Sequence, residues 1–251
     1  PFRKMRQFQD EGHTGVVIIG DYRARIGDPT GRDKTRPPLS AKAVEKNAET
    51  YLDQLYRVLD RKKTEVRWQS EWFDPMPISE IIRISRHFTL AKIMANETFC
   101  TGYEQLQGLC FHEMMYPMFQ AYDSLMVSAD IELGGTDQKF NILLGRDIQR
   151  QYDRKAQAAL LLPLLPGVDG QKMGKSLDNY ISVSGKPADM FGKVMSIKDE
   201  LIETYAKLCI PAEACQEITA NISSGQNPRD IKEKLGREIV RIYHGEKAAT
   251  A

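Results

Sequence analysis

Long apolar runs and paired cysteines are both missing from this chain. None of its apolar stretches approaches the roughly 20 residues of a membrane-spanning helix. Its basic start, "PFRKMRQFQDEGH", has no apolar segment of the kind found in a secretory signal. The four cysteines form no CxxC pair and have no metal-ligand spacing. We therefore expect reduced thiols, no metal site, no membrane partner and a cytoplasmic location.

The chain also lacks an excess of either charge, an internal repeat and a low-complexity tract. Its formal net charge is +1, which neither requires nor excludes a nucleic-acid partner. With 251 residues, of which 41% are hydrophobic and 27% charged, it has the composition of an ordinary globular protein. A chain of this length can bury a sizeable core.

Strand-like and helical patterns alternate over most of the chain. Strand-like runs occupy "TGVVIIGDY", "TEVRWQSEWF", "VSADIELGG" and "ALLLPLLPG", and the first is typical of a strand buried on both faces. Helical periodicity is found at the first residues and at residues 41–59, 78–95, 114–126 and 138–154. This alternation predicts an α/β fold with an open sheet. After about residue 187 only helical periodicity remains, which predicts a separate helical domain.

Three segments rich in glycine and charge follow strands, and in open α/β sheets ligands bind beyond the carboxyl ends of the strands. The segments are "DYRARIGDPTGRDKTRPP", "GGTDQKFN" and "VDGQKMGKSLDN". Basic side chains and lysine ammonium groups suit phosphate oxygens. Paired glycines let the backbone approach a flat ligand. The three segments are therefore candidates for one shared rim.

Each motif also has an ordinary structural explanation. "GDPTG" is common turn chemistry, Thr136 or Asp137 fits as a helix cap, and "KMGKS" fits a solvated loop that lacks the Walker A pattern. Tyr116, Gln120 and Asp123 share one helix face at i, i+4 and i+7. That face is either solvated or the wall of a polar pocket.

Taken together and in this order, "IGDPTGR", "YPMFQAYDS", "GGTDQKFN" and "KMGKSLDN" closely resemble bacterial tyrosyl-tRNA synthetases, a family of class I aminoacyl-tRNA synthetases. The resemblance extends from the first residue to at least "REIVRIYHGEKAA". It implies a Rossmann-like, doubly wound parallel sheet with a helical insertion, followed by an all-α domain. It also implies an enzyme that activates L-tyrosine with ATP to tyrosyl-adenylate and transfers the tyrosyl group to tRNA(Tyr).

The resemblance assigns the amino-acid pocket residue by residue. Asp28, Tyr116 and Gln120 resemble the set that binds the ammonium group of tyrosine. Asp123 resembles the acceptor for the phenolic hydroxyl. Gln138 is expected along the same pocket.

The nucleotide side of the site is implied in the same way. Gly135, Asp137 and Met173 are expected to contact ATP, which serves as a substrate accompanied by Mg²⁺; no prosthetic group is expected.

The phosphate groups are assigned to basic side chains. Lys172 and Lys175 resemble the KMSKS lysines that bind pyrophosphate, with Lys175 also contacting ATP. Arg32 and Arg36 resemble the basic residues of a second loop over the same phosphates. Such chemistry works by positioning and charge stabilisation, without a protein nucleophile.

Several features depart from the family pattern. Gly174 replaces the usual serine of KMSKS, and Arg23 stands where a small polar residue is expected near the amino-acid pocket. The HIGH tetrapeptide, the strand before it and the C-terminal RNA-binding module do not occur in the sequence. We therefore expect a synthetase that lacks the first part of its catalytic domain and is incomplete for activity. The alternative hypothesis is a catalytically inactive relative that serves as an RNA-binding or dimerisation module.

The expected domains are a catalytic domain at residues 1–186 and a helical domain at residues 187–251, which is expected to contact the anticodon side of the tRNA. An insertion at about residues 37–113 resembles the homodimer region of the family. Its apolar side chains fit an intramolecular core equally well; these are Ile78, Ile81, Ile82, Ile84, Leu90 and Ile93.

Overall fold

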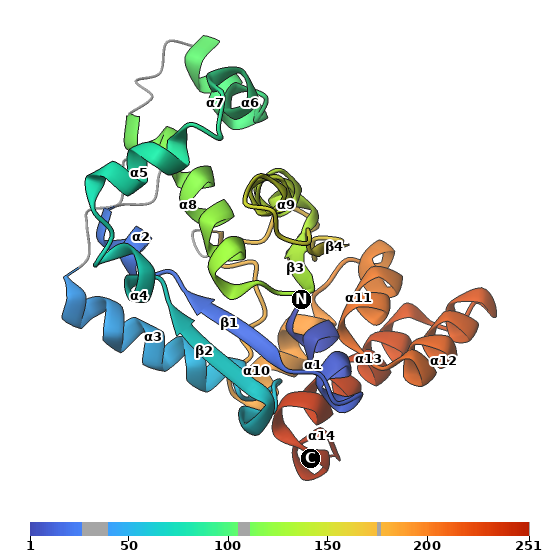
Figure 1. The fold of residues 1–251 in the computed structure, drawn as a ribbon. Helices are drawn as coiled ribbons and strands as arrows, with labels where there is room; N and C mark the ends of the chain where they lie inside the picture. The colour runs from blue at the N-terminus through green and yellow to red at the C-terminus, as the bar shows by residue number, and fades with distance from the viewer. Residues whose placement is uncertain (27–39, 105–110, 175–176, 251) are drawn as a thin grey trace. The chain divides into compact units, whose positions relative to one another are not determined.

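The computed structural model describes residues 1–26, 40–104, 111–174 and 177–250. The chain divides into two compact units, Pro1–Pro163 and Leu164–Ala251 (Figure 1). The expected domain division between residues 186 and 187 stays a prediction.

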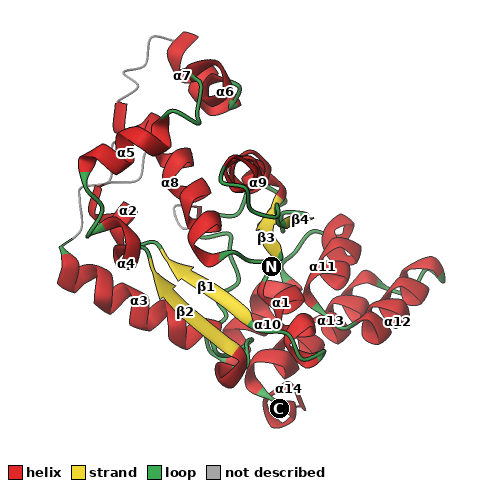
Figure 2. Ribbon diagram, in the orientation of Figure 1, coloured by secondary structure: helices red, strands yellow, loops and turns green. Residues whose placement is uncertain are grey.

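Four short strands of the first unit form two separate parallel pairs (Figure 2). β1 (Gly15–Ile19) pairs with β2 (Thr64–Trp68), and β3 (Ile131–Gly135) pairs with β4 (Ala158–Leu162). Helices connect the two strands of each pair, as parallel strands require. All four predicted strands are confirmed in position. Within the described ranges, no ladder joins β1 to β3.

β1 is buried on one face only. Val17 and Ile19 lie in a hydrophobic cluster with side chains of α3 (Ala41–Leu55), which runs beside the first strand pair. Val16 and Ile18 point to the other face and keep part of their exposure. The expectation of a strand buried on both faces is therefore half right, because the cover on the second face is partial.

The helices of the first unit follow the predicted periodicity, with one split. The segment predicted at residues 78–95 forms two helices, because Thr89 begins a new helix by accepting a hydrogen bond from the Lys92 N–H at 3.2 Å. Besides α3, the helices are α1 (Phe2–Asp10), α2 (Asp21–Ile26), α4 (Ser70–Phe73), α5 (Ile78–Ser85), α6 (Leu90–Met94), α7 (Glu97–Glu104), α8 (Phe111–Val127) and α9 (Lys139–Gln151), with short 3₁₀ turns η1 (Arg61–Lys63) and η2 (Thr136–Gln138).

An aromatic cluster fixes the helix that carries most of the predicted pocket. The ring of Phe73 on α4 packs 5.1 Å from that of Phe119 on α8 and 4.9 Å from that of Tyr22 on α2. Leu144 and Ile148 of α9 close the same core. Because α2, α4, α8 and α9 share this core, their polar side chains are held in a fixed mutual arrangement.

The second unit is a helical bundle around Val194, Tyr205 and Leu235, which are fully buried. Its elements are α10 (Pro187–Met195), η4 (Asp199–Leu201), α11 (Ile202–Cys209), α12 (Ala212–Ser223), α13 (Pro228–His244) and α14 (Glu246–Thr250). The Tyr205 hydroxyl donates to the Pro166 carbonyl at 2.7 Å, which ties the segment before α10 to the bundle. Among the described helices of both units, none is long and apolar enough to cross a membrane.

Candidate functional site

Asp123 is a buried carboxylate on α8 with donors on two sides. Gln69 Nε2 donates to its Oδ2 at 2.5 Å, and Trp72 Nε1 donates to its Oδ1 at 3.1 Å. Burial raises the pKa of Asp123 to about 7, although the nearby Arg23 guanidinium and the two hydrogen bonds act in the opposite direction. A buried carboxyl poised near neutrality in a polar network is typical of a ligand site.

Arg23 reaches this carboxylate from α2. Its Nη2 lies 3.8 Å from Asp123 Oδ2, and its Nε donates to Gln69 Oε1 at 3.2 Å. Its Nη1 donates to Gln120 Oε1 at 3.3 Å, and its guanidinium carbon lies 4.6 Å from the centre of the Tyr116 ring. The cation therefore contacts the whole polar face of α8 that the sequence singled out.

That polar face continues into the segment after β3. Gln120 Nε2 donates to Gln138 Oε1 at 3.4 Å, and Gln138 Nε2 lies 3.4 Å from Asp137 Oδ2. Asn141 on α9 donates to the same Gln138 oxygen at 3.3 Å. The structure thus brings together Tyr116, Gln120, Asp123, Gln138 and Asp137, which belong to two different predicted motifs.

The glycines of "GGTDQ" are explained partly by packing. A Cβ on Gly134 would lie 2.5 Å from the Cδ1 atom of Ile142 on α9, so a glycine lets the helix approach the end of β3. Gly135 directly precedes η2, and no side chain caps that turn or α9. The expectation of Thr136 or Asp137 as a cap is wrong, because the chain enters α9 through a 3₁₀ turn.

In the second unit, the segment that carries Lys172 and Met173 is ordered by a buried asparagine. Asn179 Oδ1 accepts from the Gly174 N–H at 2.9 Å, and its Nδ2 donates to Asp169 Oδ1 at 2.9 Å and to the Lys172 carbonyl at 3.3 Å. The Lys172 side chain is exposed. Four other predicted site residues lie outside the described residues: Asp28, Arg32, Arg36 and Lys175.

Sequence reasoning missed Gln69, Trp72 and Asn179. Gln69 follows β2 directly, so the rule that ligands lie beyond the strand ends could have flagged it. Trp72 and Asn179 gave no comparable signal, because their roles depend on contacts with residues far along the chain or on the shape of a loop.

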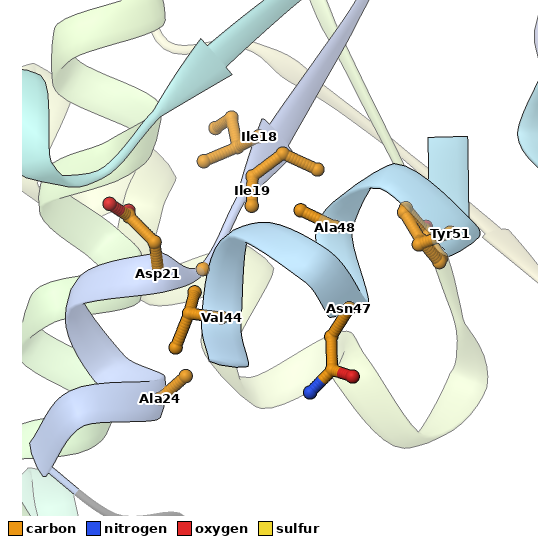
Figure 3. A pocket seen from close by; sticks show the side chains of 9 residues that line it. Ile18, Ile19, Asp21, Ala24, Val44, Asn47, Ala48 and Tyr51 are labelled. Carbon is orange, nitrogen blue, oxygen red and sulfur yellow. The ribbon is translucent and has the colours of Figure 1, made fainter. Parts of the chain in front are cut away.

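A separate hollow of about 290 Å³ lies between β1, α2 and α3 (Figure 3). Its one carboxylate, Asp21, already accepts a hydrogen bond from the Ser70 N–H at 3.0 Å. None of the described residues predicted to bind a ligand lines it. The lining residues are Ile18, Ile19, Gly20, Asp21, Ala24, Val44, Asn47, Ala48 and Tyr51.

Metal-binding side chains do not gather in the described part of either unit. Within residues 1–26, 40–104, 111–174 and 177–250, no group of three or more His, Cys, Asp or Glu side chains is placed to hold a metal ion. The carboxylates of the polar network are bound to amide, indole and guanidinium donors.

Parallel strand pairs joined by helices, with a polar network at the strand ends, define an α/β protein of the Rossmann-like class. Solved structures with this fold include the mitochondrial tyrosyl-tRNA synthetase of Aspergillus nidulans, which has a TM-score of 0.77 and 21% identity and is matched over 100% of this chain and 78% of that one. The tyrosyl-tRNA synthetase of Archaeoglobus fulgidus, complexed with L-tyrosine, has a TM-score of 0.77 and 20% identity. The match covers 100% of this chain and 84% of that one. The tryptophanyl-tRNA synthetase of Campylobacter jejuni has a TM-score of 0.64 and 18% identity, and the match covers 99% of this chain and 81% of that one. The predicted fold class is confirmed.

The chain belongs to the family of class I tRNA synthetases of the W and Y type, whose model matches residues 1–251. Among its relatives, tyrosine–tRNA ligase 2 of Vibrio parahaemolyticus is 44% identical over 100% of this chain and 64% of the relative. The tyrosine–tRNA ligase of Moorella thermoacetica is 45% identical over 98% of this chain and 61% of the relative. That of Dehalococcoides mccartyi is 47% identical over 98% of this chain and 63% of the relative. The chain therefore spans less than two thirds of the length of these relatives. The predicted resemblance to bacterial tyrosyl-tRNA synthetases is confirmed.

Proposed function

We propose that this chain carries most of the catalytic part of a tyrosine–tRNA ligase, which activates L-tyrosine with ATP and transfers the tyrosyl group to tRNA(Tyr). One observation carries the proposal. A buried aspartate, Asp123, shares a helix face with Gln120 and Tyr116, in a chain 44–47% identical to enzymes named for this activity.

In the proposed pocket, each end of tyrosine has its own partners. Asp123 accepts a hydrogen bond from the phenolic hydroxyl, and Asp28, Tyr116 and Gln120 bind the ammonium group. Gln138 supports the pocket through its contact with Gln120. Phenylalanine has no hydroxyl and would leave the buried Asp123 carboxylate unpaired, so the pocket would reject phenylalanine. Tyrosyl-tRNA synthetases are themselves a standard example of this rule.

The nucleotide is assigned to the segment after β3 and to Met173 of the second unit. Gly135 and Asp137 contact the adenosine part of ATP, and Met173 lies along it. Asp137 is exposed and adjoins the pocket residue Gln138, which suits a carboxylate that takes ribose hydroxyls.

Charge stabilisation of the phosphates is assigned to Lys172, Lys175, Arg32 and Arg36. Mg²⁺ enters with ATP, because its preferred ligands are phosphate oxygens and water. The step needs an in-line attack by the tyrosine carboxylate on the α-phosphate, with pyrophosphate leaving. Fixed cations around the leaving group supply much of the rate. The meeting of these basic segments at one site stays a prediction.

The test is tyrosine-dependent exchange of labelled pyrophosphate into ATP, measured with the protein and its Asp123→Ala variant. With an upstream segment that carries the HIGH motif supplied, we expect exchange with tyrosine, much less with phenylalanine, and a loss of at least about 100-fold in kcat/KM for the variant. The matched control is Asp130→Ala, which removes an exposed aspartate near the end of the same helix. Exchange that depends on another amino acid, or that survives in Asp123→Ala, would refute the assignment.

One observation favours a second candidate, a synthetase-like module that binds RNA or forms dimers without activating tyrosine. Arg23 already contacts Gln120 and Asp123, so the pocket is partly filled by the protein itself. Binding of tRNA(Tyr) in a filter assay, without any exchange in the same preparation, would support this candidate over the first.

The proposed partners beyond the small substrates are tRNA(Tyr) and a second copy of the chain. Residues 187–251 are assigned to the anticodon side of the tRNA. Among the described residues of the expected dimer region, the exposed apolar side chains include Ile78, Ile82 and Leu90, at 75%, 60% and 63%. Exposed apolar groups of this kind support an interface. The proposed location is the cytoplasm.

A further inference from the structure

Arg23 enters the polar network from α2 and ends among the residues assigned to tyrosine. Only 18% of its side chain is exposed. One guanidinium nitrogen donates to Gln120, another lies near Asp123, and the flat group stacks over Tyr116. A bound tyrosine would use the same three kinds of interaction there: a hydrogen bond, an ion pair and a ring contact.

Gln69 holds Arg23 in this position. Its fully buried amide accepts from both the backbone N–H and Nε of Arg23, at 3.3 and 3.2 Å, and donates to Asp123 at 2.5 Å. Because one amide binds both the cation and the carboxylate, the two are kept side by side. The arrangement is therefore a built contact between α2, the end of β2 and α8.

A guanidinium in this place opposes the binding of an amino acid in three ways. It occupies the oxygen of Gln120 that an ammonium group would use, and it partly neutralises Asp123. It also repels a second cation, because like charges a few ångströms apart in a half-buried site are poorly screened.

We infer that Arg23 occupies the amino-acid pocket from within, and that tyrosine binds only after displacing its guanidinium from Gln120 and Asp123. This inference rests on the proposed function. Arg23 then lowers the affinity of the pocket for tyrosine, and replacing Arg23 by a smaller residue makes the pocket available. Tyrosine can replace what the arginine supplies, since it brings an ammonium group and a hydroxyl donor of its own.

The first experiment is calorimetric titration of the protein with L-tyrosine. Arg23→Ala is expected to lower the Kd at least about tenfold, because a ligand no longer has to break a charge-assisted hydrogen bond. Arg23→Met keeps the bulk without the donors and is expected to change the Kd in the same direction. The matched control is Arg25→Ala on the same helix, whose guanidinium pairs with the half-exposed Asp74 at 2.6 Å. It should leave the Kd unchanged.

The second experiment needs no ligand. The Trp72 indole N–H donates to Asp123, so its ¹H–¹⁵N resonance reports the titration of that carboxyl. The chain has two tryptophans, and Trp68→Phe assigns the signal. In Arg23→Ala the midpoint is expected to rise by about one pH unit, because a cation that favours the carboxylate is gone. Glu132, whose charge also acts on Asp123, is retained in every variant.

The outcomes separate the two claims. A higher titration midpoint of Asp123 in Arg23→Ala, together with tighter tyrosine binding, supports both the inference and the proposed function. An unchanged Kd in a folded Arg23→Ala or Arg23→Met protein overturns the inference and leaves the proposed function standing. A higher midpoint with no tyrosine binding by any variant supports the placement of Arg23 and overturns the proposed function. An unmoved midpoint shows that the guanidinium does not face Asp123, and the inference fails.

Discussion

Trp72 and Asp123 are joined by a buried hydrogen bond of 3.1 Å between the indole N–H and Oδ1. The tryptophan belongs to α4 and the aspartate to α8, and both helices contribute to the same hydrophobic cluster. The bond therefore links two helices and also fixes the direction in which the carboxylate points. A buried carboxylate that loses a donor pays the cost of its own desolvation.

Trp72→Phe is expected to lower the free energy of unfolding by about 2–4 kcal/mol, because the lost hydrogen bond and the smaller ring add. Urea denaturation followed by circular dichroism measures it. Trp68→Phe, at a partly exposed position, is the matched control and should cost about 1 kcal/mol or less. Equal losses for the two variants would contradict the role given to the Trp72 bond.

Stability should fall as the pH rises from about 4 to about 7. Burial raises the pKa of Asp123 to about 7 in the folded protein, from an ordinary value of 3.8. Between these values the folded state keeps a proton that the unfolded state has released, so the slope is negative, at most about 1.4 kcal/mol per pH unit. Burial also raises the pKa of Glu132, which acts in the same direction.

Asp123→Asn removes the titrating group and keeps one acceptor oxygen, so only one of the hydrogen bonds from Gln69 and Trp72 can remain. The pH slope of the unfolding free energy should flatten between pH 4 and 7, with the contribution of Glu132 still present. Unfolding in urea at half-unit pH steps measures it. A slope identical to that of the unchanged protein would mean that Asp123 does not titrate in this range.

The elements and the pocket face could be predicted because both depend on local patterns. β1 and its neighbours follow from β-branched runs, and the face of Tyr116, Gln120 and Asp123 follows from helical spacing. The place of Gln138 in the same pocket as Gln120 was implied only by the resemblance to tyrosyl-tRNA synthetases. The strands and the helix face need only periodicity.

The contacts of Arg23 could not be predicted from its place in the sequence alone. Its guanidinium meets Gln69 and Gln120, which are 46 and 97 residues away. The 3₁₀ turn η2 before α9 was not predicted either, and the helix cap expected at Thr136 or Asp137 is absent. Side-chain partners across elements depend on packing, which no periodicity encodes.

Asn179→Ala is expected to loosen the segment of Lys172. The change leaves the Gly174 N–H, the Lys172 carbonyl and Asp169 without their shared amide, so the unfolding free energy should fall by about 1–3 kcal/mol. Amide hydrogen exchange at Gly174 should become faster even where global stability is matched with denaturant. Asp178→Asn is the control. It keeps a residue type that tolerates the positive φ of 44° and alters only an exposed contact with Lys193. Unchanged protection at Gly174 in Asn179→Ala would be inconsistent with this role.

The exposed isoleucines of α5 give the last prediction. Ile78 and Ile82 lie one turn apart on the solvent side, whereas Ile84 is 2% exposed and packs in the cluster of α8. Ile82→Lys should therefore convert a dimer to a monomer without lowering the unfolding free energy of the single chain, because only an interface loses apolar contact. Sedimentation equilibrium over a range of concentrations measures this, with Ile222→Lys, at an exposed site on α12, as the control. If the unchanged protein is already a monomer at high concentration, these side chains do not form a dimer interface.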